Sequence, residues 1–116
     1  MRFRKAKLKD AKGIAEVLTK SYNIKDIKEG ISVFKNETKK LHNYIVADDN
    51  GKIAGIVTWA VHGLPKHRLC ELDRIAVLPE YRGKGIAKKL FNALIGDAKS
   101  YYRKHKQKLR KLYLLT

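Results

Sequence analysis

This sequence is poor in cysteine and carries no long apolar run. The 116 residues include a single cysteine, Cys70, so no disulfide can form within the chain. Such cysteine usage is typical of a reducing compartment, and we expect a cytoplasmic protein in which Cys70 packs as a small buried group. No apolar segment approaches the ~18 residues of a membrane-spanning helix, and the N-terminal residues lack the apolar core of a secretory signal. We therefore expect no membrane partner.

Acidic residues are also scarce. Lys and Arg number 27 against 11 Asp and Glu, which gives a net charge of +16. A field of this sign attracts nucleic acid, acidic membranes or a small polyanion without identifying one of them. The densest basic run lies within residues 99–111, where Tyr101 and Tyr102 are adjacent to the basic residues. This run could bind a phosphate backbone, or it could be a solvated helix end, where the helix dipole favours cations.

Length and apolar periodicity predict one folded domain, residues 1–116. The elements follow the order strand, helix, helix, strand, strand, strand, helix, strand. Asn50-Gly51 is typical of a type I′ hairpin turn, and Asp10 is a candidate cap of the first helix. This order predicts an α/β (α+β) protein with a mixed sheet covered by helices. The expected strands are residues 2–8, 44–47, 53–61, 68–77 and 112–115, and the expected helices are one bearing Ile14, Val17, Leu18 and Tyr22, then residues 25–41 and 83–104.

The long third helix is predicted to bury one apolar face. Tyr44 and Trp59 are interpreted as core residues, with an aromatic cage for an ammonium group as the alternative. No close set of ligand residues indicates a metal site. The predicted buried stripes are Ile27, Ile31, Phe34 and Leu41 on the second helix, and Ile86, Leu90, Leu94 and Tyr101 on the third, with Ala87, Phe91 and Ile95 beside them.

Residues 75–87 are the most informative segment, because a strand, a sharp turn and a helix start follow one another there. The N-terminus of a helix presents unpaired N–H groups and the positive end of its dipole, so it can hold a phosphate group. Gly83 and Gly85 let the backbone approach an anion closely. Arg82 and Lys84 add positive charge beside them. The junction therefore predicts a diphosphate site.

Two common phosphate motifs do not fit this junction. A P-loop needs Ser or Thr after its Gly-Lys, whereas Lys84 is followed by Gly85, and the dinucleotide fingerprint needs a third glycine where Lys88 stands. Arg82-x-x-Gly85-x-Ala87, after a strand and Pro-Glu-Tyr, resembles the acyl-coenzyme A signature of the GNAT superfamily of N-acetyltransferases, (Gln/Arg)-x-x-Gly-x-(Gly/Ala). The resemblance extends to segments 3–11, 50–55 and 72–77, which are similar to the opening strand and helix, the hairpin and the fourth strand of that family.

The resemblance implies a GNAT-like, mostly antiparallel mixed sheet with helices on both faces. It also implies an enzyme that moves an acetyl group from acetyl-CoA to a primary amine by direct attack in a ternary complex. The pantetheine arm then pairs with the fourth strand at Ile75, Ala76 and Val77, and a strand amide such as that of Val77 or its neighbour faces the oxyanion. The implied diphosphate contacts are Arg82, Gly83, Lys84, Gly85, Ile86 and Ala87.

Acetyl transfer needs an unprotonated amine, so a general base is expected. Glu71 is the candidate, because some family members have a glutamate base at the matching place of the fourth strand. The alternative is a structural carboxylate paired with Arg68, Arg74 or another cation.

Further polar residues lie near this candidate in the sequence. Asp73 shares a face with Glu71 in a regular strand and could hold a cationic acceptor, unless a bulge changes its direction. His62 and His67 flank the turn at residues 63–65, where either could reach the acceptor or simply be solvated.

The sequence departs from the family at its C-terminal end. The family usually continues past the fifth strand and often supplies a tyrosine general acid there, whereas this sequence ends at Thr116 and Tyr113 does not match that tyrosine. We therefore expect a domain shortened after the fifth strand, either a fragment or one whose sheet a partner completes, and a second copy could pair with residues 112–115. Polyamines, aminoglycosides, protein N-termini and lysines all fit as acceptors. The alternatives to an active transferase are a nucleic-acid-binding basic module and a catalytically inactive GNAT remnant.

Overall fold

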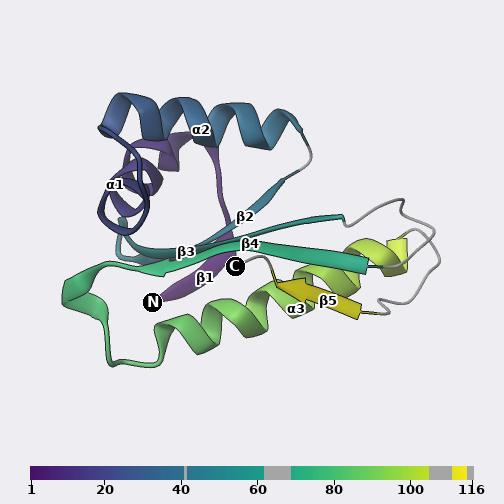
Figure 1. The fold of residues 1–116 in the computed structure, drawn as a ribbon. Coiled ribbons are helices and arrows are strands. Elements are labelled where there is room, and N and C mark those ends of the chain that lie inside the picture. The colour runs from purple at the N-terminus through teal and green to yellow at the C-terminus, as the bar shows by residue number, and fades with distance from the viewer. Residues whose placement is uncertain (41, 62–68, 105–110, 115–116) are drawn as a thin grey trace.

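The structure is a computed structural model that describes residues 1–40, 42–61, 69–104 and 111–114 (Figure 1). The predicted turn at residues 63–65, the histidines His62 and His67, and residues 105–110 of the basic run lie outside the described residues. So does Leu41, which was expected on the apolar face of the second helix.

Five strands form one sheet in the order β1-β2-β3-β4-β5. Neighbouring strands are antiparallel from β1 to β4, and β5 is parallel to β4. The mixed, mostly antiparallel sheet implied by the resemblance is therefore confirmed. The strands are β1 (Arg2–Lys5), β2 (Asn43–Asp49), β3 (Lys52–Val61), β4 (Leu69–Val77) and β5 (Lys111–Leu114).

Helices cover both faces of the sheet, as expected. Figure 1 shows α1 (Ala11–Ser21) and α2 (Ile27–Lys39) on one face and α3 (Ile86–Lys104) on the other. Each face has its own apolar core. Ile14, Leu18 and Phe34 are fully buried on the α1–α2 side, and Trp59 and Leu90 are fully buried on the α3 side. None of the described helices combines the length and apolar character needed to cross a bilayer.

The buried stripe of α3 differs from the prediction at its C-terminal end. Leu90 and Leu94 are buried as expected, but the stripe continues to Ala98 and Tyr102, whereas Tyr101 is only half-buried. The contact line follows the row of residues four apart, which is inclined to the helix axis, so it drifts away from Tyr101. The ring of Tyr101 packs edge-on against Trp59, with centroids 5.8 Å apart.

The first strand and the first helix cap were also predicted differently. β1 ends at Lys5 and not at residue 8, because Lys7 N–H turns back to donate to Asp10 Oδ2 at 2.7 Å. Asp10 does precede α1, but its carboxylate makes no capping hydrogen bond to that helix. It accepts two hydrogen bonds from Arg4 instead, at 2.8 and 2.9 Å, so it holds β1 against the start of α1.

The second helix and the hairpin follow the sequence signals closely. α2 is capped by Asp26, whose side chain accepts from Glu29 N–H at 2.8 Å, and the helix ends two residues before the predicted boundary. Asn50 and Gly51 both have positive φ, 51° and 99°, as the predicted type I′ turn requires.

Candidate functional site

The sheet opens at the C-terminal half of β4. Within residues 111–114, β5 pairs with Leu69 to Leu72 of β4 and with none after Leu72, so no described strand lies beside the outer edge of β4 further along. The register with β3 also shifts here, because Thr58 lies opposite Arg74 while Trp59 lies opposite Leu72. Asp73 is thus the extra residue of a β-bulge, a device that re-aims side chains beside active sites.

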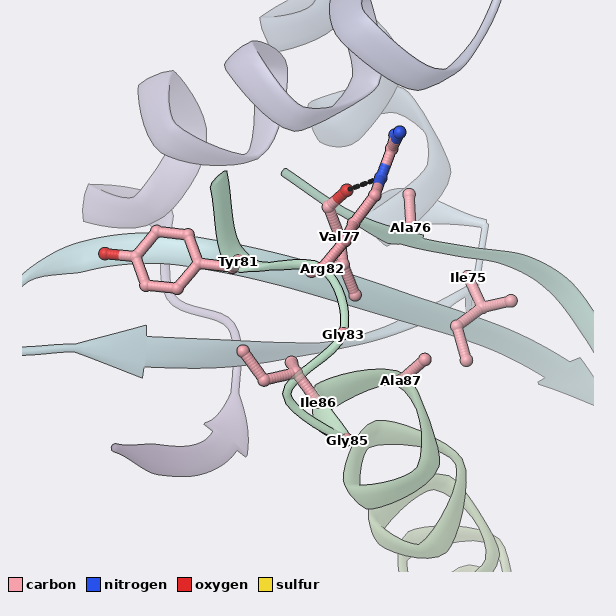
Figure 2. Close-up of a pocket in the computed structure, with 9 residues that line it drawn as sticks. All are labelled: Ile75, Ala76, Val77, Tyr81, Arg82, Gly83, Gly85, Ile86 and Ala87. Carbon is pink, nitrogen blue, oxygen red and sulfur yellow. Dashed lines mark hydrogen bonds between the residues drawn. The ribbon is translucent and has the colours of Figure 1, made fainter. Parts of the chain in front are cut away.

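A cavity of about 270 Å³ lies where β4 leads into α3. Figure 2 shows the side chains that line it, which come from the end of β4, the following turn and the first turn of α3. The structure therefore brings together eight of the nine residues predicted to bind the cofactor. Lys84 does not line the cavity. Its Nζ lies 5.5 Å from the ring centre of Tyr81. The lining residues are Ile75, Ala76, Val77, Tyr81, Arg82, Gly83, Gly85, Ile86 and Ala87.

The bend before α3 has the open backbone that an anion site needs. Gly83 and Gly85 have φ values of +79° and +76°, and apart from their chain neighbours no atom lies within 4 Å of where a Cβ would stand on either. A side chain at these positions would be strained and would fill the cradle. Because these two glycines have left-handed backbone angles, α3 begins at Ile86 and not at Gly83 as predicted.

Most N–H groups of this bend make no backbone hydrogen bond among the described residues. Among the described residues, the N–H groups of Gly83, Lys84 and Gly85 have no carbonyl partner, whereas Arg82 N–H donates to Pro79 O at 3.2 Å. Gly85 O accepts from Lys89 N–H at 3.3 Å, so the first helical hydrogen bond is already in place behind the bend. A row of free donors at a helix N-terminus can bind a diphosphate.

The free edge of β4 carries two side-chain contacts that the sequence did not predict. The hydroxyl of Tyr22 accepts from Ile75 N–H at 3.0 Å and donates to Ile75 O at 3.1 Å. Arg82 Nε donates to Val77 O at 3.1 Å, the contact drawn in Figure 2. Because backbone groups alternate in a strand, the N–H of Val77 faces the same edge as that of Ile75. This edge can pair with an extended amide-bearing chain once Tyr22 gives way.

Charged side chains gather on the α2 side of the bulge. Asp73 Oδ2 lies 2.8 Å from His42 Nδ1. Burial raises the pKa of Asp73, the His42 ring acts to lower it, and the neighbouring Glu71 carboxylate raises it. Glu71 and Asp73 are therefore next to each other. The sequence predicted this for a regular strand, and it holds here although a bulge is present. Of the cations considered as alternative partners of Glu71, Arg74 donates to Glu37 at 2.6 Å and Arg68 lies outside the described residues.

Glu37 is the centre of a second group on the same face. It accepts from Arg74 Nη1 and from the hydroxyl of Tyr44, both at 2.6 Å. Burial acts to raise the pKa of Glu37, but the bonds from Arg74 and Tyr44 outweigh it and leave that pKa lowered. Burial, together with Glu37, raises the pKa of Tyr44. Tyr44 is thus a core residue with a satisfied hydroxyl.

Other candidate residues have structural positions. Trp59 is fully buried, and its Nε1 donates to Asp97 Oδ2 at 2.9 Å, which identifies it as core and not as part of a cage. Burial raises the pKa of Cys70 to about 11, as expected for an inert small group. The described residues include no cluster of three or more His, Cys, Asp or Glu side chains that could hold a metal ion.

Comparison with known families identifies the fold that carries this site. The sequence model of the acetyltransferase (GNAT) family matches residues 11–114. The chain belongs to the GNAT acetyltransferase family. The glycine bend, the open edge of β4 and the bulge described above therefore belong to a GNAT domain. No curated protein matches this GNAT sequence at a significant level.

Solved structures agree with the family assignment. An N-acetyltransferase from Staphylococcus aureus Mu50 is 27% identical with a TM-score of 0.70, and the match covers 86% of this GNAT chain and 67% of that one. A ribosomal-protein-alanine N-acetyltransferase from Brucella melitensis biovar Abortus 2308 is 24% identical with a TM-score of 0.76, covering 97% and 77%. A predicted acetyltransferase with acetyl-CoA from Clostridium acetobutylicum is 22% identical with a TM-score of 0.72, covering 99% and 80%. The last two share the fold.

Proposed function

We propose that this GNAT protein transfers an acetyl group from acetyl-CoA to a primary amine by direct attack in a ternary complex. One observation carries the proposal. A bend of free N–H groups and left-handed glycines, residues 83–85, stands at one end of a cavity whose wall is the open edge of β4. An anion cradle followed by a strand edge matches a ligand that has a diphosphate followed by an extended arm containing amides.

The residues of the site fit acetyl-CoA in the following way. The diphosphate is held by Arg82 to Ala87, where a Cβ on Gly83 or Gly85 would fill the cradle. The arm pairs with β4 at residues 75–77, which brings the thioester toward the bulge at Asp73. A β4 amide, that of Val77 or of its neighbour, faces the carbonyl oxygen as negative charge develops there. Glu71, beside Asp73, takes a proton from the acceptor amine.

The similar structures support the same chemistry. The Staphylococcus aureus protein is an N-acetyltransferase, and the Clostridium acetobutylicum structure is described with acetyl-CoA. The Brucella melitensis protein acts on ribosomal-protein alanine by its name, which makes a peptide N-terminus one acceptor to test. Polyamines, aminoglycosides and lysine side chains are tested beside it.

Cofactor binding is tested by calorimetry with acetyl-CoA on the wild type and on Gly85→Ala. Wild type is expected to bind, and ligand at 100 times its dissociation constant adds about 2.7 kcal/mol to the free energy of unfolding. Gly85→Ala should weaken binding at least tenfold. Gly51→Ala is the matched control, because Gly51 also has positive φ and open space but lies in the hairpin. Absence of wild-type binding, or equal weakening by both variants, contradicts the proposal.

Acetyl transfer is tested by thiol release from acetyl-CoA over a panel of amines. Glu71→Gln is expected to lower kcat and to flatten the pH–rate profile, because its amide cannot accept the proton. Full activity of Glu71→Gln at pH 7 would show that Glu71 is not the base.

A second candidate function, binding of a nucleic-acid backbone, is favoured by the surface of α3. The only acidic residue of this helix, Asp97, is turned toward Trp59, while Lys88, Lys99 and Arg103 are exposed along one side. Lys99→Gln/Arg103→Gln should reduce the salt slope of single-stranded oligonucleotide binding by about 1.4. Lys28→Gln/Lys35→Gln on α2 makes the same charge change on the opposite face and should leave that slope nearly unchanged.

A further inference from the structure

His42, Asp73 and Glu71 meet at the bulge of β4, although His42 comes from the segment between α2 and β2. We propose that these three side chains form a proton relay. Glu71 takes the proton of the acceptor amine, Asp73 receives it from Glu71, and His42 passes a proton on to solvent. The relay rests on the proposed acetyl transfer. It adds a positioning residue, His42, that the sequence did not indicate.

The contacts connect the three groups without a gap. The His42 ring nitrogen Nδ1 lies 2.8 Å from Asp73 Oδ2, and the Glu71 carboxylate adjoins that of Asp73. The second and third members of the relay differ in their exposure to water. The Asp73 side chain is 13% exposed and that of His42 is 27% exposed, so the imidazole is the member that is more open to water.

The bulge lies just before the part of β4 that lines the cavity. Asp73 stands two residues before Ile75, which lines the cavity. A ligand with its phosphates at residues 83–85 and its arm along Val77 and Ile75 therefore ends beside the bulge. The bulge also turns Arg74 to the same face as Asp73, where Arg74 is held by Glu37 and so does not neutralise the relay carboxylates directly.

The tautomer of His42 that the relay needs follows from its partner. Asp73 can pass a proton only to an unprotonated Nδ1, so the ring enters the relay with its own proton on Nε2. Once Asp73 has taken the proton of Glu71, it donates that proton to Nδ1, and the Nε2 proton leaves to water. Among the described residues, the titratable or charged groups around the relay include Glu37 on α2, Tyr44 on β2 and Arg74 on β4. The guanidinium of Arg74 stands over the ring of Tyr22 at the end of α1, 5.7 Å from its centre.

The proton balance of the reaction requires one exit. An ammonium acceptor loses one proton to Glu71, and its nitrogen then forms a C–N bond with the thioester carbonyl carbon. The C–S bond breaks, and the second amine proton ends on the departing thiolate. The proton on Glu71 is the net product, and it must reach solvent before the next turnover. Asp73 and His42 provide that route.

Coupling between the two ends of the relay is measured by NMR of the His42 ring at a fixed pH. Glu71→Gln removes a negative charge beside Asp73, so the ring resonances of His42 should shift relative to wild type. Glu80→Gln is the matched control, since Glu80 is an exposed carboxylate whose contact is Lys52, 3.8 Å away. An equal shift in both variants, or none in Glu71→Gln, overturns the relay.

The kinetic consequence separates a relay from a merely structural histidine. His42→Gln is expected to lower kcat about tenfold near pH 7 and progressively less toward pH 9, where solvent base accepts the proton from Glu71. A decrease by the same factor at every pH, or no decrease, contradicts the relay. Failure of the proposed function itself has a different result, because wild type would then neither bind acetyl-CoA nor release thiol.

Discussion

Arg4 forms a largely buried ionic contact with two carboxylates. Its guanidinium donates to both carboxylate oxygens of Asp10, and Asp48 accepts a third bond at 3.1 Å. Arg4 is 14% exposed and Asp10 6%, so water screens this pair poorly. A planar guanidinium suits such two-point binding, which a lysine cannot provide.

Asp10→Asn should therefore destabilise the protein by about 3 kcal/mol at pH 7. The uncharged asparagine binds the buried guanidinium of Arg4 more weakly than the carboxylate of Asp10 does. The Arg4 contact lowers the pKa of Asp10 in the folded protein. The stabilisation is thus present above the unfolded-state pKa of ~3.9 and is lost as pH falls through the lower folded value. Urea unfolding of both proteins from pH 7 to pH 3 checks this, and the difference should shrink below about pH 4. A difference that does not depend on pH would assign the loss to packing.

Thr58 offers the opposite test. Its side chain is fully buried, and within the described residues its hydroxyl has no hydrogen-bond partner. Thr58→Val keeps the shape and removes the unsatisfied group, so it should stabilise the fold by about 1 kcal/mol. Thr19→Val is the control, since the Thr19 hydroxyl donates to Glu16 O at 2.9 Å and its loss should not stabilise. Denaturation midpoints that move in the same direction in both variants would refute this account.

Sequence reasoning identified the site residues whose role depends on local backbone. Gly83 and Gly85 stand close together in the sequence, so an open backbone for an anion could be predicted there from the local pattern, whereas their positive φ values were not predicted. Tyr22 and His42 could not be found in this way. Their partners, Ile75 and Asp73, are separated from them by 53 and 31 positions, and only the assembled sheet brings them together.

At the scale of elements, the two helix layers contact the rest of the protein differently. α1 and α2 cross closely at Gly30, where an added Cβ would stand 2.7 Å from Ala15 Cβ and 2.8 Å from Ala15 Cα. Gly96 on α3 faces open space. Hence the same substitution has opposite expected effects on the two helices.

Gly30→Ala should destabilise the fold by about 1–3 kcal/mol through overpacking against α1. Gly96→Ala should stabilise it by about 0.5–1 kcal/mol, because alanine restricts the unfolded chain and favours the helix. Chemical denaturation of the two variants beside wild type measures both. Stabilisation by Gly30→Ala would mean that the two helices can separate at no cost.

Most elements could be predicted from periodicity, and their boundaries differ for physical reasons. The start of α3 moved from residue 83 to 86 because two left-handed glycines cannot continue into a right-handed helix. The bulge at Asp73 had no signal in the sequence, since it arises from the register between β3 and β4. Its effect on the site is large, because the side chains of the consecutive residues Asp73 and Arg74 lie on the same face of the sheet.

At the scale of the whole molecule, the net charge of +16 sets the electrostatic environment. Many cations have no acidic partner to pair with, so their mutual repulsion opposes folding. We expect the urea midpoint to rise as NaCl increases from about 20 mM to about 0.5 M, since the screening length falls severalfold. Sucrose at matched osmolality controls for non-ionic effects. A midpoint that falls with salt would show that ion pairs such as Arg4–Asp10 outweigh the repulsion.

The hydroxyl of Tyr22 gives the unliganded protein an internal competitor. It satisfies both main-chain groups of Ile75, so the arm of the proposed acetyl-CoA ligand would have to displace two hydrogen bonds that are already made. The apparent affinity for that ligand is then lowered, because only the fraction of molecules with this strand edge open can bind it. Tyr22→Phe should accordingly bind acetyl-CoA several times more tightly in calorimetry, and weaker binding would mean that the hydroxyl assists the ligand. Departure of this ring from the sheet edge also alters its contact with Arg74, so tyrosine resonances can report when the acyl donor has seated.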